Sequence, residues 1–214
     1  MSSTAEGLET LVERAAALAG RGSRRVLGIA GPPGAGKSTL ADALAAGLAA
    51  RGHRVVVVPM DGFHLAQAEL ERLGRADRKG APDTFDAAGF VALLRRITRP
   101  GADAVYAPAF DRALEEPIAG AIAVEAETAL VIVEGNYLLL EDAPWSEAAA
   151  LLDETWYVRI DAVVRVERLV ARHRRFGRDE RAARDFVATS DERNAELVAR
   201  SAERADLIVN MGMG

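Results

Sequence analysis

The sequence predicts an α/β fold in which a parallel five-stranded sheet carries helices on both faces. Five short apolar runs, rich in valine, leucine and isoleucine, are separated by longer segments with helical periodicity. Runs of this kind are typical of strands that are buried on both faces, as in parallel sheets joined by crossover helices. A glycine-rich loop also joins the first run to the helix that follows it.

The first element is a helix over residues 4–19, because apolar residues such as Leu8, Leu11 and Ala15 recur at helical spacing. The elements expected after it are strands over 25–30, 54–59, 129–133, 155–160 and 206–209, with helices ending near 51 and over 65–73, 87–98, 145–152 and 161–176. Asp161 can cap the last of these helices, and two further helical segments follow it. Short strands are expected near 104–106 and over 118–124, with a loop at Phe110-Asp111-Arg112 between them.

Composition limits the class of protein. At 214 residues, half of them apolar, the chain is expected to form a single domain over 1–214. A net charge of −5 argues against a general nucleic-acid binder. The absence of cysteine excludes disulfides and thiolate metal sites and fits a reducing compartment. Because no apolar stretch approaches the length of a membrane span and the N-terminus lacks a basic signal, we expect no membrane association and a cytoplasmic location.

Residues Gly31 to Thr39 read Gly-Pro-Pro-Gly-Ala-Gly-Lys-Ser-Thr and match the phosphate-loop pattern G-x-x-x-x-G-K-[ST]. A buried strand before the loop and a helix after it make a chance glycine-rich turn a poor alternative. Lys37 would reach the β- and γ-phosphates, and the Ser38 hydroxyl would bind Mg²⁺. The chain is therefore predicted to bind a nucleoside triphosphate. The candidate nucleotide-binding residues of the loop are Gly31, Gly34, Ala35, Gly36, Lys37, Ser38 and Thr39.

Lysine is scarce in this chain. Of 27 basic residues only two are lysines, Lys37 and Lys79. Lysine is a compact charge on a flexible stem, whereas arginine is a planar fork, so a chain that retains so few lysines is expected to need them where they stand. This makes Lys79 a candidate substrate contact, with a surface lysine left by chance as the alternative.

Two carboxylates follow predicted strands. Asp61 comes directly after the second strand and Glu134 after the third, and ligands bind at the carboxyl ends of parallel strands. One carboxylate can orient the metal while the other accepts a proton from an attacking hydroxyl. The alternative is that both are helix caps or turn residues. His64, three residues after Asp61, is a candidate substrate contact or a structural histidine.

Six arginines crowd the segment 165–178. Clustered arginines over a phosphate loop can stabilise charge on a phosphoryl group in transfer and exclude water. Arg168, Arg172 and Arg175 fall on one helical stripe and are the favoured group, with Arg172 in a catalytic role. The alternative is a solvated helix face with salt bridges to nearby acids.

Four ordered motifs carry a resemblance to a known family. They are Gly31–Thr39, Met60-Asp61-Gly62-Phe63-His64, Lys79-Gly80-Ala81-Pro82-Asp83-Thr84-Phe85-Asp86 and Val133-Glu134-Gly135-Asn136. Over about residues 24–210 the chain resembles the phosphoribulokinase, uridine kinase and bacterial pantothenate kinase group. The resemblance implies an adenylate-kinase-like P-loop fold with an acceptor-binding insertion over about 62–125 and a mobile arginine-rich lid over about 165–190.

The same resemblance implies transfer of the γ-phosphate from ATP, with Mg²⁺, to a hydroxyl of a small molecule such as a sugar, a nucleoside or a pantothenate-like compound. In that family the base or acceptor-orienting aspartate corresponds to Asp61, the glutamate near Mg²⁺ to Glu134, and an acceptor contact to Arg112. The Asp-Gly-Phe-His motif departs from the Asp-Ser-Phe-Tyr of uridine kinases. It looks most like a branch labelled nucleoside/nucleotide kinase or fructose-transport-associated kinase.

Two other functions stay open at this point. A P-loop ATPase coupled to a protein partner needs no acceptor pocket, and a nucleoside monophosphate kinase needs extra arginines, for which Arg75, Arg78 and Arg112 are candidates outside the lid. A regulatory GTPase is disfavoured because the Asn-Lys-x-Asp element that reads guanine is absent. The sequence is compatible with a homodimer.

Overall fold

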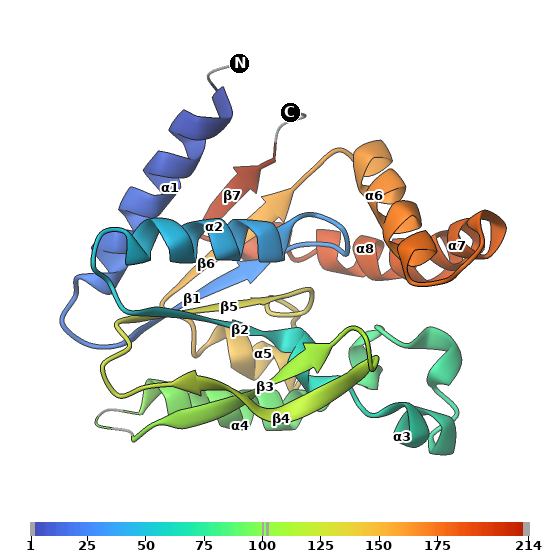
Figure 1. The fold of residues 1–214 in the computed structure, drawn as a ribbon, viewed down its shortest axis with the longest axis horizontal. Helices are drawn as coiled ribbons and strands as arrows, with labels where there is room; N and C mark the ends of the chain where they lie inside the picture. Colours follow the sequence, from blue (N-terminus) through green and yellow to red (C-terminus); the bar gives the residue numbers. More distant parts are fainter. Residues whose placement is uncertain (1–2, 100, 102, 212–214) are drawn as a thin grey trace.

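The computed structural model describes residues 3–99, 101 and 103–211 (Figure 1). Its centre is a five-stranded sheet in the order β2-β5-β1-β6-β7, and every adjacent pair is parallel. The strands are β1 (Arg25–Ala30), β2 (Val55–Pro59), β5 (Leu130–Gly135), β6 (Glu154–Arg159) and β7 (Leu207–Asn210). The predicted α/β fold with five parallel strands is confirmed.

Eight α-helices surround this sheet in the described part of the chain. They are α1 (Ser3–Ala19), α2 (Lys37–Ala49), α3 (Gln67–Arg72), α4 (Ala87–Thr98), α5 (Trp145–Ala149), α6 (Ala162–Arg175), α7 (Glu180–Phe186) and α8 (Glu192–Ala199). The helix over 87–98 and the strand over 25–30 have the predicted bounds, whereas α5 is shorter than the predicted 145–152. No helix in the described ranges is both long and apolar enough to cross a membrane.

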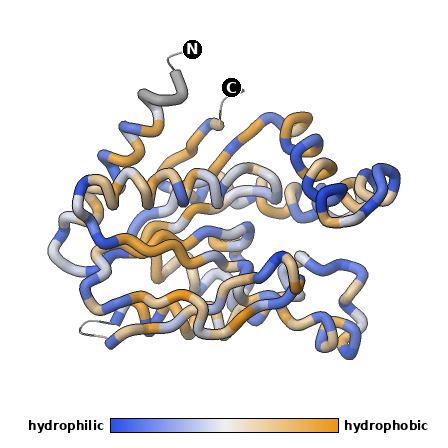
Figure 2. Tube along the Cα trace, in the orientation of Figure 1, coloured by the Kyte–Doolittle hydropathy of each residue, from blue (hydrophilic) through white to orange (hydrophobic). Residues whose placement is uncertain are grey.

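The sheet is buried on both faces because its side chains alternate between two cores. On β1, Leu27 and Ile29 pack with α1 and α2, while Val26 and Ala30 face the core formed with α4 and α5. This period of two is what makes each strand a continuous apolar run in the sequence. Figure 2 shows hydrophobic residues concentrated along the strands and hydrophilic residues over α7.

A β-hairpin packs with α4 beside the main sheet (Figure 1). It consists of β3 (Val105–Asp111) and β4 (Glu116–Val124), which are antiparallel. The predicted loop at Phe110-Asp111 is wrong, because both residues lie in β3 and only Arg112 belongs to the turn. The pairing shifts register between Ala107 and Ala109, which breaks the alternation that identifies a strand in sequence.

The carboxyl ends of three neighbouring strands meet at one level. Ile29 of β1 and Pro59 of β2 are both paired with Glu134 of β5, which lies between them. The phosphate loop starts two residues after Ile29, and Asp61 comes two residues after Pro59. Segments that are far apart in the chain therefore reach the same edge of the sheet, where open parallel sheets bind their ligands.

Close packing at this edge depends on Gly135. A Cβ atom added there would lie 2.5 Å from Cβ and 2.8 Å from Sδ of Met60, the residue before Asp61. We expect Gly135→Ala to lower the free energy of unfolding by about 1–3 kcal/mol, as overpacking of a core does. Urea denaturation followed by circular dichroism would measure it.

Gly7→Ala is the matched control for this experiment. Gly7 lies in α1 with open space around its would-be Cβ, so the added methyl group should stabilise the helix by up to about 1 kcal/mol. Equal stability of the Gly135→Ala variant and the unmodified protein would show that Met60 yields without cost.

Candidate active site

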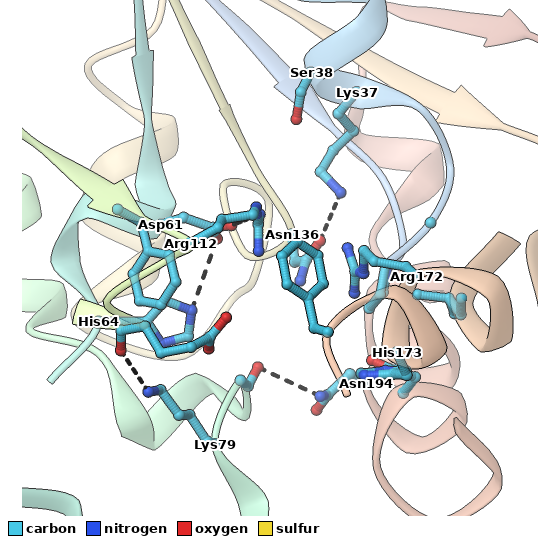
Figure 3. A pocket seen from close by; sticks show the side chains of 18 of the residues that line it. Lys37, Ser38, Asp61, His64, Lys79, Arg112, Asn136, Arg172, His173 and Asn194 are labelled. Atoms are coloured by element: carbon cyan, nitrogen blue, oxygen red, sulfur yellow. Dashed lines mark hydrogen bonds and ion pairs between the residues drawn. The ribbon is translucent and has the colours of Figure 1, made fainter. Parts of the chain in front are cut away.

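A cleft of about 1240 Å³ lies at the carboxyl edge of the sheet. The parts of the chain that line it include the phosphate loop, the turn that carries Asp61, the loop that carries Lys79, the tip of the β3–β4 hairpin and one side of α6 (Figure 3). It contains both carboxylates and both lysines that the sequence singled out. The structure thus brings Lys37, Ser38, Asp61, Lys79 and Glu134 to one cavity, whereas Gly31 and Ala35 of the loop are not among its lining residues.

The phosphate loop leads from β1 into α2 with backbone shapes that favour glycine. Gly34 and Gly36 have φ values of +78° and +95°, in the left-handed region. Gly36 is the N-cap of α2 and has no side chain to bond the first-turn amides, which leaves them for an anion. A Cβ atom at Gly34 would lie 2.8 Å from Cγ of Leu169, so the loop packs directly on α6.

Lys37 is buried at the first position of α2 and spans the loop. Its Nζ donates hydrogen bonds to the carbonyl oxygen of Pro32 at 3.1 Å and to Oδ1 of Asn136 at 2.6 Å (Figure 3). Burial lowers the pKa of Lys37, and the negative charges of Glu134 and Asp61 oppose that shift. Sequence reasoning assigned no role to Asn136, although its place two residues beyond Glu134 is a signal that could have found it.

Ser38 and Glu134 form a direct pair across the edge of the sheet. The Ser38 hydroxyl donates to Oε1 of Glu134 at 2.9 Å, and Glu134 is only 6% exposed. Burial raises the pKa of the Glu134 carboxyl, while Lys37 acts against the shift and Asp61 adds to it. The carboxyl group is thus held among Lys37, Ser38 and Asp61.

The oxygen atoms of Ser38 and Glu134 fit a Mg²⁺ ion that is bound together with a nucleotide. Mg²⁺ is usually held by one or two protein oxygens and takes its other ligands from phosphate and water. A hydroxyl and a carboxylate one hydrogen bond apart supply those oxygens. The described residues contain no group of three or more His, Cys, Asp or Glu side chains that could hold a metal by themselves.

Asp61 follows β2 in the short turn Met60–Phe63, across the cleft from the phosphate loop. Its Oδ2 accepts a hydrogen bond from Nη2 of Arg112, at the hairpin tip, at 3.1 Å. His64 Nε2 lies 3.9 Å from its Oδ1. Two predicted acceptor contacts therefore flank the predicted base.

His64 is held in an aromatic setting. Its side chain is 11% exposed and stacks on Phe85, with ring centroids 4.0 Å apart, and Phe110 lies 5.0 Å away. Burial, with smaller contributions from the positive charges of Lys79 and Arg112, lowers the pKa of His64 to about 4, against the pull of Asp61. The imidazole is therefore neutral at neutral pH.

Lys79 lies at the end of the cleft opposite Lys37, on the side that the sequence predicts to bind the acceptor (Figure 3). Its Nζ donates to the carbonyl oxygen of Glu115 at 2.8 Å and sits 5.6 Å from the centroid of the Phe110 ring. Arg112 lies 5.7 Å from the same centroid. The two predicted cations thus share one aromatic ring.

Only two of the three arginines predicted to form one stripe on α6 line the cleft. Arg168 and Arg172 line the cleft, whereas Arg175, at the last position of the helix, is exposed and outside the residues that line it. Burial lowers the pKa of Arg172; the negative charge of Asp191 opposes the shift and the positive charge of Arg112 adds to it. The alternative, a solvated helix face with salt bridges, holds for Arg174, which forms a surface ion pair with Glu180 at 3.3 Å.

A polar cluster in the wall of the cleft, formed by His173, Asp191 and Asn194, was not predicted from the sequence. His173 Nε2 lies 2.8 Å from Oδ2 of Asp191, and Asn194 Nδ2 donates to the carbonyl oxygen of Gly80 at 3.3 Å. The hydroxyl of Tyr137 donates to the same carbonyl. The bond from Asn194 ties α8 to the loop that carries Lys79, and the bond from Tyr137 ties the segment after β5 to the same loop. No sequence pattern predicts contacts between segments so far apart.

The chain is similar to a known family model and to a named relative. A family model described as methylmalonyl Co-A mutase-associated GTPase MeaB matches residues 2–64, which include the phosphate loop but not Glu134 or α6. A protein of Schizosaccharomyces pombe named "Putative uridine kinase C227.14" is 39% identical over 171 residues, 77% of this chain and 73% of the relative.

Solved structures similar to this chain are also described as kinases. A structure described as a "putative fructose transport system kinase" from Silicibacter sp. TM1040 has a TM-score of 0.85 and 36% identity, covering 94% of this chain and 98% of that one. Phosphoribulokinase from Rhodobacter spheroides shares the fold, with a TM-score of 0.66 at 12% identity, over 88% of this chain and 70% of that one.

The chain belongs to the phosphoribulokinase and uridine kinase-like family of P-loop kinases. The resemblance seen in the sequence motifs is confirmed. Its kinase relatives support an ATP-dependent phosphotransferase activity on a small molecule.

The setting of His64 predicts how stability depends on pH. Its folded pKa, about 4, is below its usual value of 6.5, so the unfolded chain binds the proton more tightly and stability falls as pH drops through this window. Between pH 7.5 and 5 the loss due to His64 should be about 2 kcal/mol. In urea denaturation at the two pH values, the free energy of unfolding of the His64→Gln variant should fall by about 2 kcal/mol less than that of the unmodified protein. An identical fall in both proteins would contradict a buried neutral imidazole.

Proposed function

We propose that this protein transfers the γ-phosphoryl group of ATP to a hydroxyl group of a small metabolite. The observation that carries the proposal is the position of Asp61, which faces the same cleft as Lys37 and Ser38 from the end of a nearby strand. A carboxylate across a cleft from a phosphate loop is suited to accept the proton of an attacking hydroxyl.

The phosphate side of the cleft would hold the triphosphate by its backbone. The amides of the loop Gly31–Thr39 and the first turn of α2 bind phosphate oxygens, and Lys37 exchanges its bond to Asn136 for one to the β- and γ-phosphates. Ser38 and Glu134 would hold Mg²⁺, which when bound neutralises charge on the phosphate oxygens.

The acceptor side would orient the hydroxyl. Arg112 fixes the Asp61 carboxylate, whose other oxygen takes the proton as the acceptor oxygen bonds to the γ-phosphorus and the bond to the ADP leaving oxygen breaks. Arg172 and Arg168, on the opposite wall, stabilise the charge on the phosphoryl group in transfer.

In this proposal the chain is one kinase domain with two working parts. Residues 62–125, which include Lys79 and the β3–β4 hairpin, form the acceptor site. Residues 165–190, from within α6 to near the end of the π-helical turn Val187–Asp191, form the lid over the phosphates.

An ADP-release assay with ATP and Mg²⁺ tests this function. The panel holds sugars, nucleosides, pantothenate and nucleoside monophosphates, with a control that lacks any acceptor. Stimulation by one hydroxyl compound supports the proposal. Equal slow hydrolysis in every well would favour an ATPase coupled to a partner, and selective stimulation by a nucleoside monophosphate would favour the corresponding kinase.

Replacement of the proposed base should separate chemistry from nucleotide binding. We expect Asp61→Asn to cut turnover by about 10²-fold or more, in the range of general acid–base groups, while ATP affinity stays within a few-fold. Steady-state kinetics and calorimetric titration with ATP would measure the two effects. Asp42→Asn, the same change at an exposed position of α2, is the matched control. Unchanged turnover in Asp61→Asn would remove Asp61 from the mechanism.

Lys37→Ala should behave differently, because Lys37 faces the phosphates in both ground and transition states. We expect weaker ATP binding and lower turnover together, since a charge-assisted hydrogen bond is worth about 1.5–3 kcal/mol. Titration with ATP by calorimetry checks the binding. Intact ATP affinity in this variant would contradict our assignment of the loop.

A further inference from the structure

We propose that the acceptor is an anion: a small hydroxy compound with a carboxylate or phosphate group, which Lys79 and Arg112 bind at the end of the cleft away from the phosphate loop. The inference rests on the proposed kinase function and names the chemical class of its acceptor. Figure 3 shows Lys79 and Lys37 at opposite ends of the pocket. Asp61 and Arg112 lie next to each other between them.

Two cations converge on one ring in this part of the cleft. Lys79 Nζ and the guanidinium carbon of Arg112 lie 5.6 Å and 5.7 Å from the centroid of Phe110, which lines the cavity. Both positive charges also act on the nearby His64, whose imidazole is neutral at neutral pH and adds no charge of its own. An anion placed between the two cations would relieve their repulsion.

Three carboxylates on this side of the cleft have polar partners other than Lys79. Asp61 is paired with Arg112. Oε1 of Glu116 accepts the backbone N–H of Gln67 at 3.0 Å, and Oδ1 of Asp111 accepts the N–H groups of Ala113 and Leu114 at 2.8 Å and 3.0 Å. In the described part of the chain none of these three acids forms a hydrogen bond or ion pair with Lys79, although Oε2 of Glu116 is buried without a hydrogen-bond partner.

Lys79 therefore keeps an unbalanced charge. Its hydrogen bond goes to a neutral carbonyl group, that of Glu115, and in the described residues it forms no ion pair. An ammonium group has three donors, so two are left for a ligand. Burying a ligand beside such a charge is favourable when the ligand supplies the opposite one.

The hairpin turn holds Lys79 in place. Glu115, whose carbonyl accepts the Lys79 bond, has a φ of 55°, in the left-handed region that residues other than glycine rarely adopt. Such a conformation is strained and persists where the surrounding structure requires it. The turn thus presents its carbonyl group to Lys79 and keeps the ammonium at the cavity.

The phosphate side has enough cations without Lys79. Lys37, Arg168 and Arg172 line the cleft beside the loop, and Arg172 is near enough to Arg112 to feel its charge. The γ-phosphoryl group would take up these charges. Lys79 lies beyond them, and both lysines of a chain with 27 basic residues line this cleft. A second anion, on the acceptor, accounts for the second lysine.

Calorimetric titration tests the inference without relying on turnover. The protein, saturated with Mg²⁺ and a non-hydrolysable ATP analogue, is titrated with matched pairs: glycerate and glycerol, pantothenate and pantothenol, fructose 6-phosphate and fructose. We expect an anionic member to bind about 10- to 100-fold more tightly than its neutral partner, the range of one charge-assisted hydrogen bond. The pairs also distinguish a carboxylate from a phosphate.

Variants of Lys79 complete the test. Lys79→Met should abolish the preference for the anion, Lys79→Arg should restore part of it, and Arg96→Met, at an exposed position of α4, should leave it intact. Equal binding of both members of every pair, no binding of any anion, or a preference that survives Lys79→Met would overturn the inference. Failure of the kinase function itself is distinct: an anion would bind with this preference, yet no ADP would form in its presence.

Discussion

The register between β1, β5 and β2 is the constraint on which the cleft depends. Parallel hydrogen bonding sets Ile29 and Pro59 level with Glu134, so that three strands end at one height. A slip of one residue would turn each strand's apolar side chains to the other face, and both cores oppose that change. The positions of the phosphate loop, Glu134 and Asp61 therefore depend on strand pairing and on the two cores that hold its register.

Within that frame, three ionisable groups form one electrostatic unit. Burial disfavours the charged form of Lys37 and of Glu134, and each favours the charge of the other, while Asp61 supports the charge on Lys37 and opposes it on Glu134. Loss of one member would leave a buried charge without its counterpart. Asn136 and Ser38 complete the unit as neutral partners, which hold Lys37 and Glu134 in position. The cleft is thus arranged around charge compensation as much as around shape.

The sequence predicts the sheet and most of the site because both follow from local patterns. Asp61 and Glu134 could be placed since strand ends in a parallel sheet share an edge. Both strands of the hairpin were expected, but Phe110 and Asp111 were assigned to the loop because the irregular register of β3 hides the alternation. Contacts such as that between Asn194 and Gly80 join segments over a hundred residues apart, and only the folded chain determines them. Arg175 fits the helical stripe, yet the helix ends there, outside the cleft.

The scarcity of lysine gives the cleft a chemical signature. Both lysine side chains line it, Lys37 at the phosphate loop and Lys79 at the acceptor side, so reagents that modify amines have no other side-chain target in this protein. Apart from the terminal amine, covalent labelling with such a reagent would report on the cleft alone. Protection of one lysine and not the other would reveal which half of the cleft is occupied.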